Sequence, residues 1–125
     1  MRMYTKDHTW VVVNGTRARV GISDFAQQEL GDIAYVELPS MGKRLERGEV
    51  ACTVDSLKSS SEVYAPVTGT VSEVNDILAS EEKCAVVNTD PLGDGWLFSM
   101  EMSEPSELEL LLPEEEYLSF IRSGK

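Results

Sequence analysis

The sequence is poor in the residues that most metal sites and membrane anchors need. It has one histidine and two cysteines, Cys52 and Cys84, which are not in metal-ligand spacing. We therefore expect no zinc site, and we expect both cysteines, which lie in apolar strand-like runs, to be small buried hydrophobic residues. No apolar run approaches the ~18 residues of a membrane-spanning helix. The N-terminus has no apolar or arginine- and serine-rich leader, so we expect a cytoplasmic protein of the bacterial type; a mature mitochondrial form would look the same.

Basic residues are also scarce. Eleven lysines and arginines stand against 22 aspartates and glutamates, which gives a formal net charge of −11. A nucleic acid would repel such a chain, and an anionic membrane surface is disfavoured for the same reason. Partners with basic docking surfaces are favoured, although solubility alone explains the charge equally well.

Signs of catalysis are lacking as well. No Ser-His-Asp set can be assembled around the single histidine, His8, and the chain has no glycine-rich phosphate loop. We therefore expect a non-catalytic protein.

What the chain does have is a series of short strand-like segments, rich in β-branched and aromatic residues, separated by turns. Asn14 and Gly15 predict a two-residue hairpin turn, because both accept a positive φ. A chain of 125 residues suits a single domain over residues 1–125, with a monomer as the default. The pattern predicts a mostly β fold, a flattened barrel or sandwich. The expected strands are residues 10–13, 17–22, 33–38, 50–54, 62–64, 70–74 and 96–102, and residues 84–87 form a further apolar run.

Two helical regions are expected. Ser23 caps a short helix that Gly31 ends, and Phe25 and Leu30 are predicted to face the core. Residues 103–125 form a helical C-terminal tail, in which Ser106 and Glu109 have the spacing of a capping box. A second helix of this tail has Pro113 in its first turn, glutamates 114–116 near its start, and Arg122 and Gly124 near its end.

One lysine, Lys58, lies at the centre of a predicted hairpin. Four serines surround it at positions 56, 59, 60 and 61, so its amine is reachable by an enzyme. Asp55 and Glu62 flank it with opposite charge, and Pro66 and Gly69 are expected to anchor the returning strand. We expect Gly69 to take a positive φ at that turn.

Three separated groups of residues, in a fixed order, add to this pattern. They are His8-Thr9-Trp10 with residues 20–27 and 30–32, then residues 36–39 with Gly42 and Gly48, then residues 55–58 with 64–69, Val71 and 73–75. Asn88, Pro91 and Gly95-Trp96 follow, before the acidic tail. The ordered set, over nearly the full length, resembles the glycine cleavage H-protein family.

This resemblance implies a fold of the lipoyl-domain type and lipoate in amide linkage on Lys58. It implies a carrier that takes the aminomethyl group of glycine from the P protein, the pyridoxal-phosphate decarboxylase, to the T protein, the aminomethyltransferase. The L protein, dihydrolipoyl dehydrogenase, then reoxidises the dithiol. A lipoate ligase or a lipoyl or octanoyl transferase would load the lysine.

Two positions depart from the family pattern. Thr9 stands where the family has an acidic residue, and Phe25 stands where it has a histidine. By resemblance, these positions and His8 lie at the cleft in which the arm rests, although His8 could simply fix the N-terminal strand beside Trp10. The family's Pro-x-Leu-Ile-Asn stretch is altered to residues 84–88, which we interpret as repacking of the core.

Three other functions stay open at this point. A lipoate or octanoate relay to other enzymes is suggested by the changes at Thr9 and Phe25. A biotin carrier is less favoured, because Leu57 and Ser59 flank Lys58 where biotin carriers have methionines. The third is an unmodified acidic β module that binds a basic partner.

Overall fold

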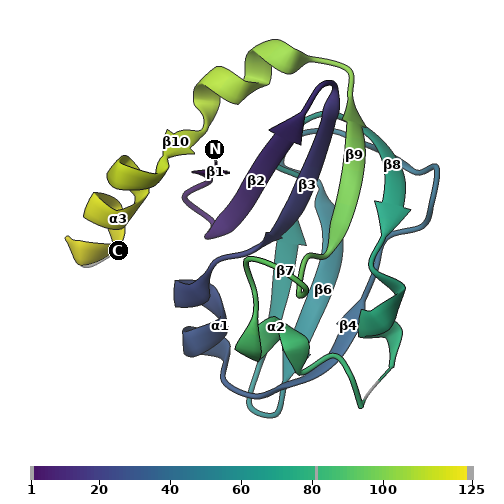
Figure 1. Cartoon of the computed structure of the whole chain (residues 1–125), viewed down its shortest axis with the longest axis vertical. Helices are drawn as coiled ribbons and strands as arrows, with labels where there is room; N and C mark the ends of the chain where they lie inside the picture. The colour runs from purple at the N-terminus through teal and green to yellow at the C-terminus, as the bar shows by residue number, and fades with distance from the viewer. Residues whose placement is uncertain (1, 81, 124–125) are drawn as a thin grey trace.

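The computed structural model describes residues 2–80 and 82–123, whose strands form two antiparallel sheets (Figure 1). A seven-stranded sheet has the order β10-β1-β2-β3-β9-β8-β5, and a three-stranded sheet has the order β4-β6-β7. The strands are β1 Arg2–Tyr4, β2 Thr9–Asn14, β3 Arg17–Ile22, β4 Ile33–Glu37, β5 Arg44–Leu45, β6 Val50–Ser56, β7 Ser60–Tyr64, β8 Gly69–Val74, β9 Phe98–Met102 and β10 Leu112–Pro113. The predicted mostly β fold is confirmed.

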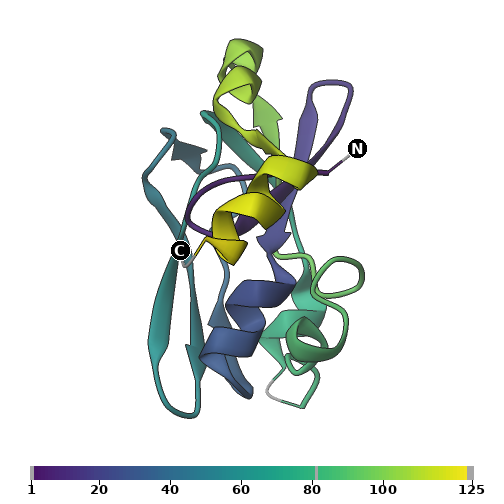
Figure 2. The ribbon, with the colours of Figure 1, turned by 90° about the vertical axis from the view of Figure 1, so that its left-hand side faces the viewer.

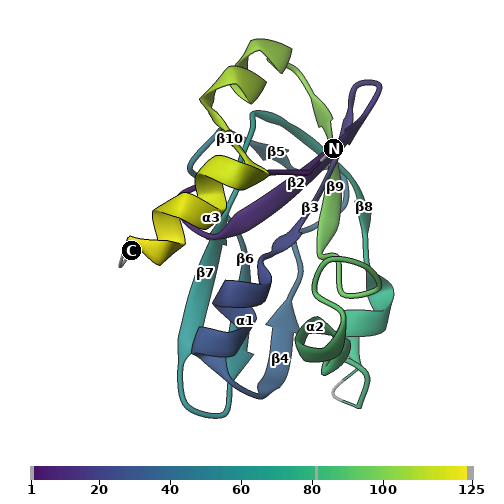
Figure 3. The same ribbon diagram turned by 60° about the vertical axis from the view of Figure 1, so that its left-hand side comes forward.

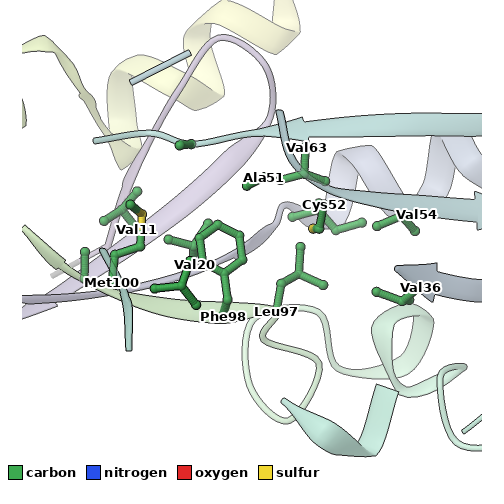
Figure 4. Close-up of a cluster of buried hydrophobic side chains, with 14 of the residues drawn as sticks. Val11, Val20, Val36, Ala51, Cys52, Val54, Val63, Leu97, Phe98 and Met100 are labelled. Carbon is green, nitrogen blue, oxygen red and sulfur yellow. The ribbon is translucent and has the colours of Figure 1, made fainter. Parts of the chain in front are cut away.

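The core lies between the two sheets. Each sheet turns alternate side chains inward, because successive residues of a strand point to opposite faces. Val20 and Phe98 of the large sheet face Val54 and Val63 of the small one, and all four are at most 3% exposed. Figure 4 shows these side chains meeting between the sheets. A small sheet needs a buried hydrophobic face to be stable, and the large sheet covers that face here.

The helices are short and lie at both ends of the molecule and beside the N-terminal strand (Figure 1). They are α1 Asp24–Leu30, α2 Val86–Thr89 and α3 Glu114–Arg122, with 3-10 turns η1 Asp76–Ala79 and η2 Pro105–Leu110. The tip of the β6–β7 hairpin lies at the same end as α1 and α2 (Figures 1 and 3). The third helix, α3, lies beside β1 and above α1 in Figure 2.

The predicted limits of α1 are confirmed. Ser23 Oγ accepts from the backbone N–H of Ala26 at 3.1 Å, and Gly31 ends the helix with φ 82°. Leu30 is buried in the core, as expected. The prediction for Phe25 is wrong, because its ring is half-buried against His8, with ring centroids 4.7 Å apart, and does not enter the core.

The β2–β3 turn lies one residue later than predicted. Asn14 pairs with Arg17 across the hairpin, so Gly15 and Thr16 make the turn. Gly15 has φ 68°, and neither Asn14 nor Thr16 has a positive φ. This is the pattern of a turn with glycine at its first central position.

The apolar run at residues 84–87 is not strand-like. Cys84 lies in a turn, and Val86 begins α2. A run of four residues is too short for periodicity to tell a helix from a strand. Both cysteines are nonetheless buried, as expected, and burial raises the pKa of the Cys52 thiol to about 12.

The C-terminal tail differs from its prediction in two respects. Ser106 does not cap a helix, because the η2 turn begins at Pro105 and its N-cap residue, Glu104, makes no side-chain cap bond. A short strand, β10, then pairs with β1, and its Pro113 is the N-cap residue of α3; the prediction that Pro113 lies in the first turn of this helix is therefore wrong. The glutamates at 114–116 lie in the first turn of α3 and Arg122 in its last, as predicted, whereas Gly124 lies outside the described residues.

The turn before β8 is held by the tail. The Glu107 carboxylate accepts from the Thr68 backbone N–H at 2.6 Å and from the Thr68 hydroxyl at 2.8 Å. The predicted positive φ at Gly69 is wrong. Glycine is needed there for a different reason: a Cβ at Gly69 would lie 2.1 Å from the Glu101 carbonyl oxygen of β9.

Replacing Gly69 by alanine should therefore destabilise the fold through a steric clash. We expect Gly69→Ala to lower the free energy of unfolding in urea by at least about 2 kcal/mol. Gly15→Ala is the control, since its Cβ meets nothing within 4 Å and only φ 68° opposes it, at a cost of about 1 kcal/mol. Equal losses in the two variants would contradict the clash.

Candidate functional site

Lys58 lies exposed at the tip of the β6–β7 hairpin. The last strand pair is Asp55 with Ser60, so the tip extends only a few residues beyond the sheet. The Ser56 hydroxyl oxygen accepts from the backbone N–H groups of Lys58 and Ser59, at 3.3 and 3.0 Å. The Ser56 N–H in turn donates to the Ser59 carbonyl at 2.8 Å. These local bonds hold the backbone of the tip, from which the Lys58 side chain and its amine extend.

The tip also rests on the link between α1 and β4. The Leu57 backbone N–H donates to the Asp32 carbonyl at 3.0 Å. The Lys58 side chain lies over Gly31, where an added Cβ would be 3.4 Å from Lys58 Cε. Gly31 has φ 82° and ψ −158°, a conformation that essentially only glycine adopts. Glycine is therefore needed at position 31 for the chain path, whereas an added Cβ would only make an ordinary contact with Lys58.

A side-chain amide holds this link from the other side. Asn88 Nδ2 donates to Gln27 Oε1 and to the Gly31 carbonyl, both at 2.9 Å, and Asn88 Oδ1 accepts from the Ile33 N–H at 2.9 Å. Sequence reasoning missed this role and treated residues 84–88 as core only. The one signal available was that Asn88 is retained where the rest of that stretch departs from the family pattern.

A cleft of about 390 Å³ opens beside the tip, starting at Ser59. The three residues predicted to lie at an arm cleft, His8, Thr9 and Phe25, all line it. The other walls are α1 and the returning strand β7. The remaining lining residues are Asp7, Ile22, Ala26, Glu29, Leu30, Val54, Ser60, Ser61, Glu62 and Val63.

The cleft has both an apolar wall and acidic groups. Thr9 is 1% exposed and pairs with Ile22 in the sheet. Because threonine is uncharged, its side chain adds no charge to the wall. Carboxylates are supplied instead by Asp7, Glu29 and Glu62, none of which was predicted to line a cleft. Because they come from three separate segments of the chain, their proximity depends on the fold and could not be predicted from spacing.

His8 joins the cleft wall to the C-terminal helix. Its Nδ1 lies 2.7 Å from the Tyr117 hydroxyl, which lies 2.7 Å from Ser23 Oγ. A neutral ring suits this chain, with Ser23 donating to Tyr117 and Tyr117 donating to Nδ1. The His8 backbone has φ 70°, uncommon for a residue with a side chain. His8 thus bonds to α3 through its ring, and its backbone N–H donates to the Thr5 carbonyl at 3.1 Å in the segment before β2.

Burial of the imidazole lowers the pKa of His8, while the negative charges of Asp7 and Glu29 act in the opposite direction. The net shift is downward, which favours the neutral ring in the folded protein.

Within residues 2–80 and 82–123, no group of three or more histidine, cysteine or acidic side chains could hold a metal ion. No helix of this part of the chain is long and apolar enough to cross a membrane.

Comparison with known proteins places these features in a family. The family model described as "Glycine cleavage H-protein" matches residues 2–124. The chain belongs to the glycine cleavage H-protein family. The H protein of Thermotoga maritima is 46% identical over 120 residues, which are 96% of this chain and 95% of that protein. That of Rhodospirillum rubrum is 49% identical over 94% of this chain and 93% of its own.

A solved structure agrees with the fold. The crystal structure of a glycine cleavage system H protein from Mycobacterium marinum matches with a TM-score of 0.81 and 37% identity, over 94% of each chain. The family resemblance and the H-protein type of fold predicted from the sequence are therefore confirmed. Glycine cleavage H proteins are lipoyl carriers, and this chain is a carrier component of that kind.

The titration of His8 can be followed without ambiguity, because it is the only histidine. Since its folded pKa is lowered, the unfolded chain binds the proton more readily, and stability falls as pH drops from about 6.5 toward the folded pKa. Above about pH 6.5 this contribution is fully present. We expect an NMR midpoint for the ring below 6.5.

The matched variant is His8→Asn, because asparagine tolerates the positive φ. Wild type should lose more stability than this variant between pH 7.5 and 5.5, measured by urea unfolding. A midpoint at or above the ordinary histidine value, or parallel pH profiles, would contradict the neutral ring.

Proposed function

We propose that Lys58 carries lipoate, joined through an amide bond to its Nζ, and that the cleft beside it receives the arm. The observation that carries this proposal is the placement of one exposed lysine at a hairpin tip, directly beside a cleft of about 390 Å³. The carrier role itself follows from the family to which the chain belongs.

The residues present fit such a group. The exposed amine leaves a loading enzyme free access, and the Asp32 carbonyl and the Ser56 hydroxyl oxygen accept from the backbone N–H groups of Leu57 and Lys58. The cleft offers apolar contacts from Phe25 and Leu30 to an alkyl chain. When bound, lipoate would accept two electrons and a carbon group through sulfur, so that the chain can collect the aminomethyl group of glycine at the P protein and deliver it at the T protein.

The chain's own residues would hold and protect the loaded arm. The carboxylates of Asp7, Glu29 and Glu62 line the cleft, and a cationic amine is stabilised beside negative charge. These three carboxylates take the place of the acidic residue that the family pattern has at position 9, where this chain has threonine. His8, fixed by Tyr117, forms part of the wall and stays neutral near pH 7. Tethering raises the effective concentration of the arm at each enzyme it visits.

The partners follow from this role. They are the P, T and L proteins of the glycine cleavage system, and a lipoate ligase or lipoyl or octanoyl transferase that loads Lys58. The net charge of −11 favours partners with basic docking surfaces. We propose that the chain acts as a single domain, as a monomer in the cytoplasm, and is not itself a catalyst.

A second function is favoured by one observation. Phe25 stands in the cleft where the family pattern has a histidine, and its ring lies tilted against that of His8, so the arm meets an apolar ring in place of a hydrogen-bonding one. This suits a relay that receives lipoyl or octanoyl groups and passes them to other enzymes.

Lys58 should be modified in cells. The intact mass of the protein from its own cells should show one lipoyl or octanoyl group, which peptide mapping should place on Lys58. Lys58→Arg should abolish the modification and leave the free energy of unfolding within about 0.5 kcal/mol, since the side chain is exposed. A bare Lys58 in lipoate-replete cells would overturn the proposal in favour of an unmodified acidic module.

Glycine exchange separates the carrier from the relay. The lipoylated chain, given glycine and P protein, should become aminomethylated at a rate typical of H proteins, because acidic side chains still line the cleft. The readouts are the mass of the carrier and the exchange of labelled bicarbonate into glycine. Lipoyl transfer to other enzymes without aminomethylation would establish the relay instead.

A further inference from the structure

We propose that Asn88 is a positioning residue for Lys58: its side-chain amide fixes residues 31–33, and these residues fix the hairpin tip that presents the lysine. The inference rests on the proposed function of Lys58, which it deepens by naming how the lysine is held in place. The side-chain bonds of Asn88 within residues 2–80 and 82–123 go to Gln27, Gly31 and Ile33 and not to the hairpin, so it acts through the link between α1 and β4.

The link needs an outside partner because the sheet does not hold it fully. The β4–β6 ladder shifts register between Ile33 and Tyr35, next to the hairpin end. A register shift of this kind leaves backbone groups without their regular partners, and such groups must find others. Asn88 Oδ1 accepts from the Ile33 N–H, and Asn88 Nδ2 donates to the Gly31 carbonyl, each at 2.9 Å. One side chain thus fixes the residues on both sides of Asp32.

The residues so fixed are those that support the tip. The Asp32 carbonyl, between the two groups that Asn88 binds, accepts from the Leu57 N–H at 3.0 Å. Gly31 lies against the methylenes of Lys58, since a Cβ added at Gly31 would be 3.4 Å from Lys58 Cε. A shift of the link therefore moves both the backbone before Lys58 and the surface on which its side chain lies.

Removing the Asn88 amide should lower the fraction of molecules whose tip has the conformation that a loading enzyme recognises. It should not change the reactivity of Lys58 Nζ. When a partner binds only one conformer, its apparent affinity is the intrinsic affinity multiplied by the fraction of molecules in that conformer. Asn88→Ala should therefore raise the KM of a lipoate ligase for the unmodified chain, by up to about tenfold, and leave kcat unchanged.

The chain offers a matched control in Asn75. Its amide also donates two bonds to backbone carbonyls, those of Asp94 and Trp96, at 2.8 Å each. Neither partner belongs to the hairpin or to residues 31–33. Asn75→Ala should lower global stability without a specific effect on Lys58.

The first test is native-state hydrogen exchange on the unmodified full chain, followed by NMR. In Asn88→Ala, the Leu57 amide should exchange about tenfold faster than in wild type, the factor for roughly 1.4 kcal/mol of local stability. In Asn75→Ala, Leu57 should change no more than the amides of β3. Should Asn88→Ala not fold, Gln27→Ala, which removes one partner of Asn88, should give a smaller increase in the same direction.

The second test is loading by a lipoate ligase in vitro, with KM and kcat measured separately. An unchanged Leu57 exchange rate in Asn88→Ala, an equal rise in Asn75→Ala, or a loss in kcat alone would overturn the role of Asn88. Wild type that cannot be loaded at all would instead overturn the proposed function, while the exchange experiment would still decide whether Asn88 positions the tip.

Discussion

The burial of one sheet face against the other is the interaction on which the rest of the molecule depends. The small sheet β4-β6-β7 buries its apolar face, including Val54 and Val63, in the same core as Val20 and Phe98 of the large sheet, and this burial is favourable. Hydrophobic contact fixes the plane of the sheet, and hydrogen bonds at its end then fix the tip. The lysine can therefore be exposed and still extend from a backbone of defined position.

Much of the fold could be predicted from local patterns. Strand segments were recognisable because they are rich in β-branched and aromatic residues and are separated by turns, and the limits of α1 because Ser23 and Gly31 are a cap and a stop with clear chemistry. Predictions failed where a local pattern competed with a distant contact. Phe25 has the helical spacing of a core residue, but its ring packs against the ring of His8, with the two centroids 4.7 Å apart. Ser106 has the spacing of a cap, yet its segment forms a 3-10 turn whose Glu107 binds Thr68.

The candidate site divides in the same way. Lys58 could be found because its small neighbours and flanking strands lie next to it in sequence, and the family pattern named His8, Thr9 and Phe25. The bonds that hold these residues could not be found, since His8 and Tyr117 are 109 positions apart and Asn88 and Ile33 are 55 apart. Single polar residues at such separations carry no periodic signal. Only the folded chain shows that they meet.

The order of the strands bears on behaviour at high concentration. An open sheet edge can pair with the edge of another molecule and start aggregation. Both edges of the large sheet are strands of two residues, β10 and β5, and Pro113 in β10 has no N–H to offer a neighbour. In the small sheet, the outer strand β7 carries Glu62, and like charges on two copies would repel. A carrier with edges of this kind can be abundant and collide often with its enzymes without its sheets pairing edge to edge with those of another molecule.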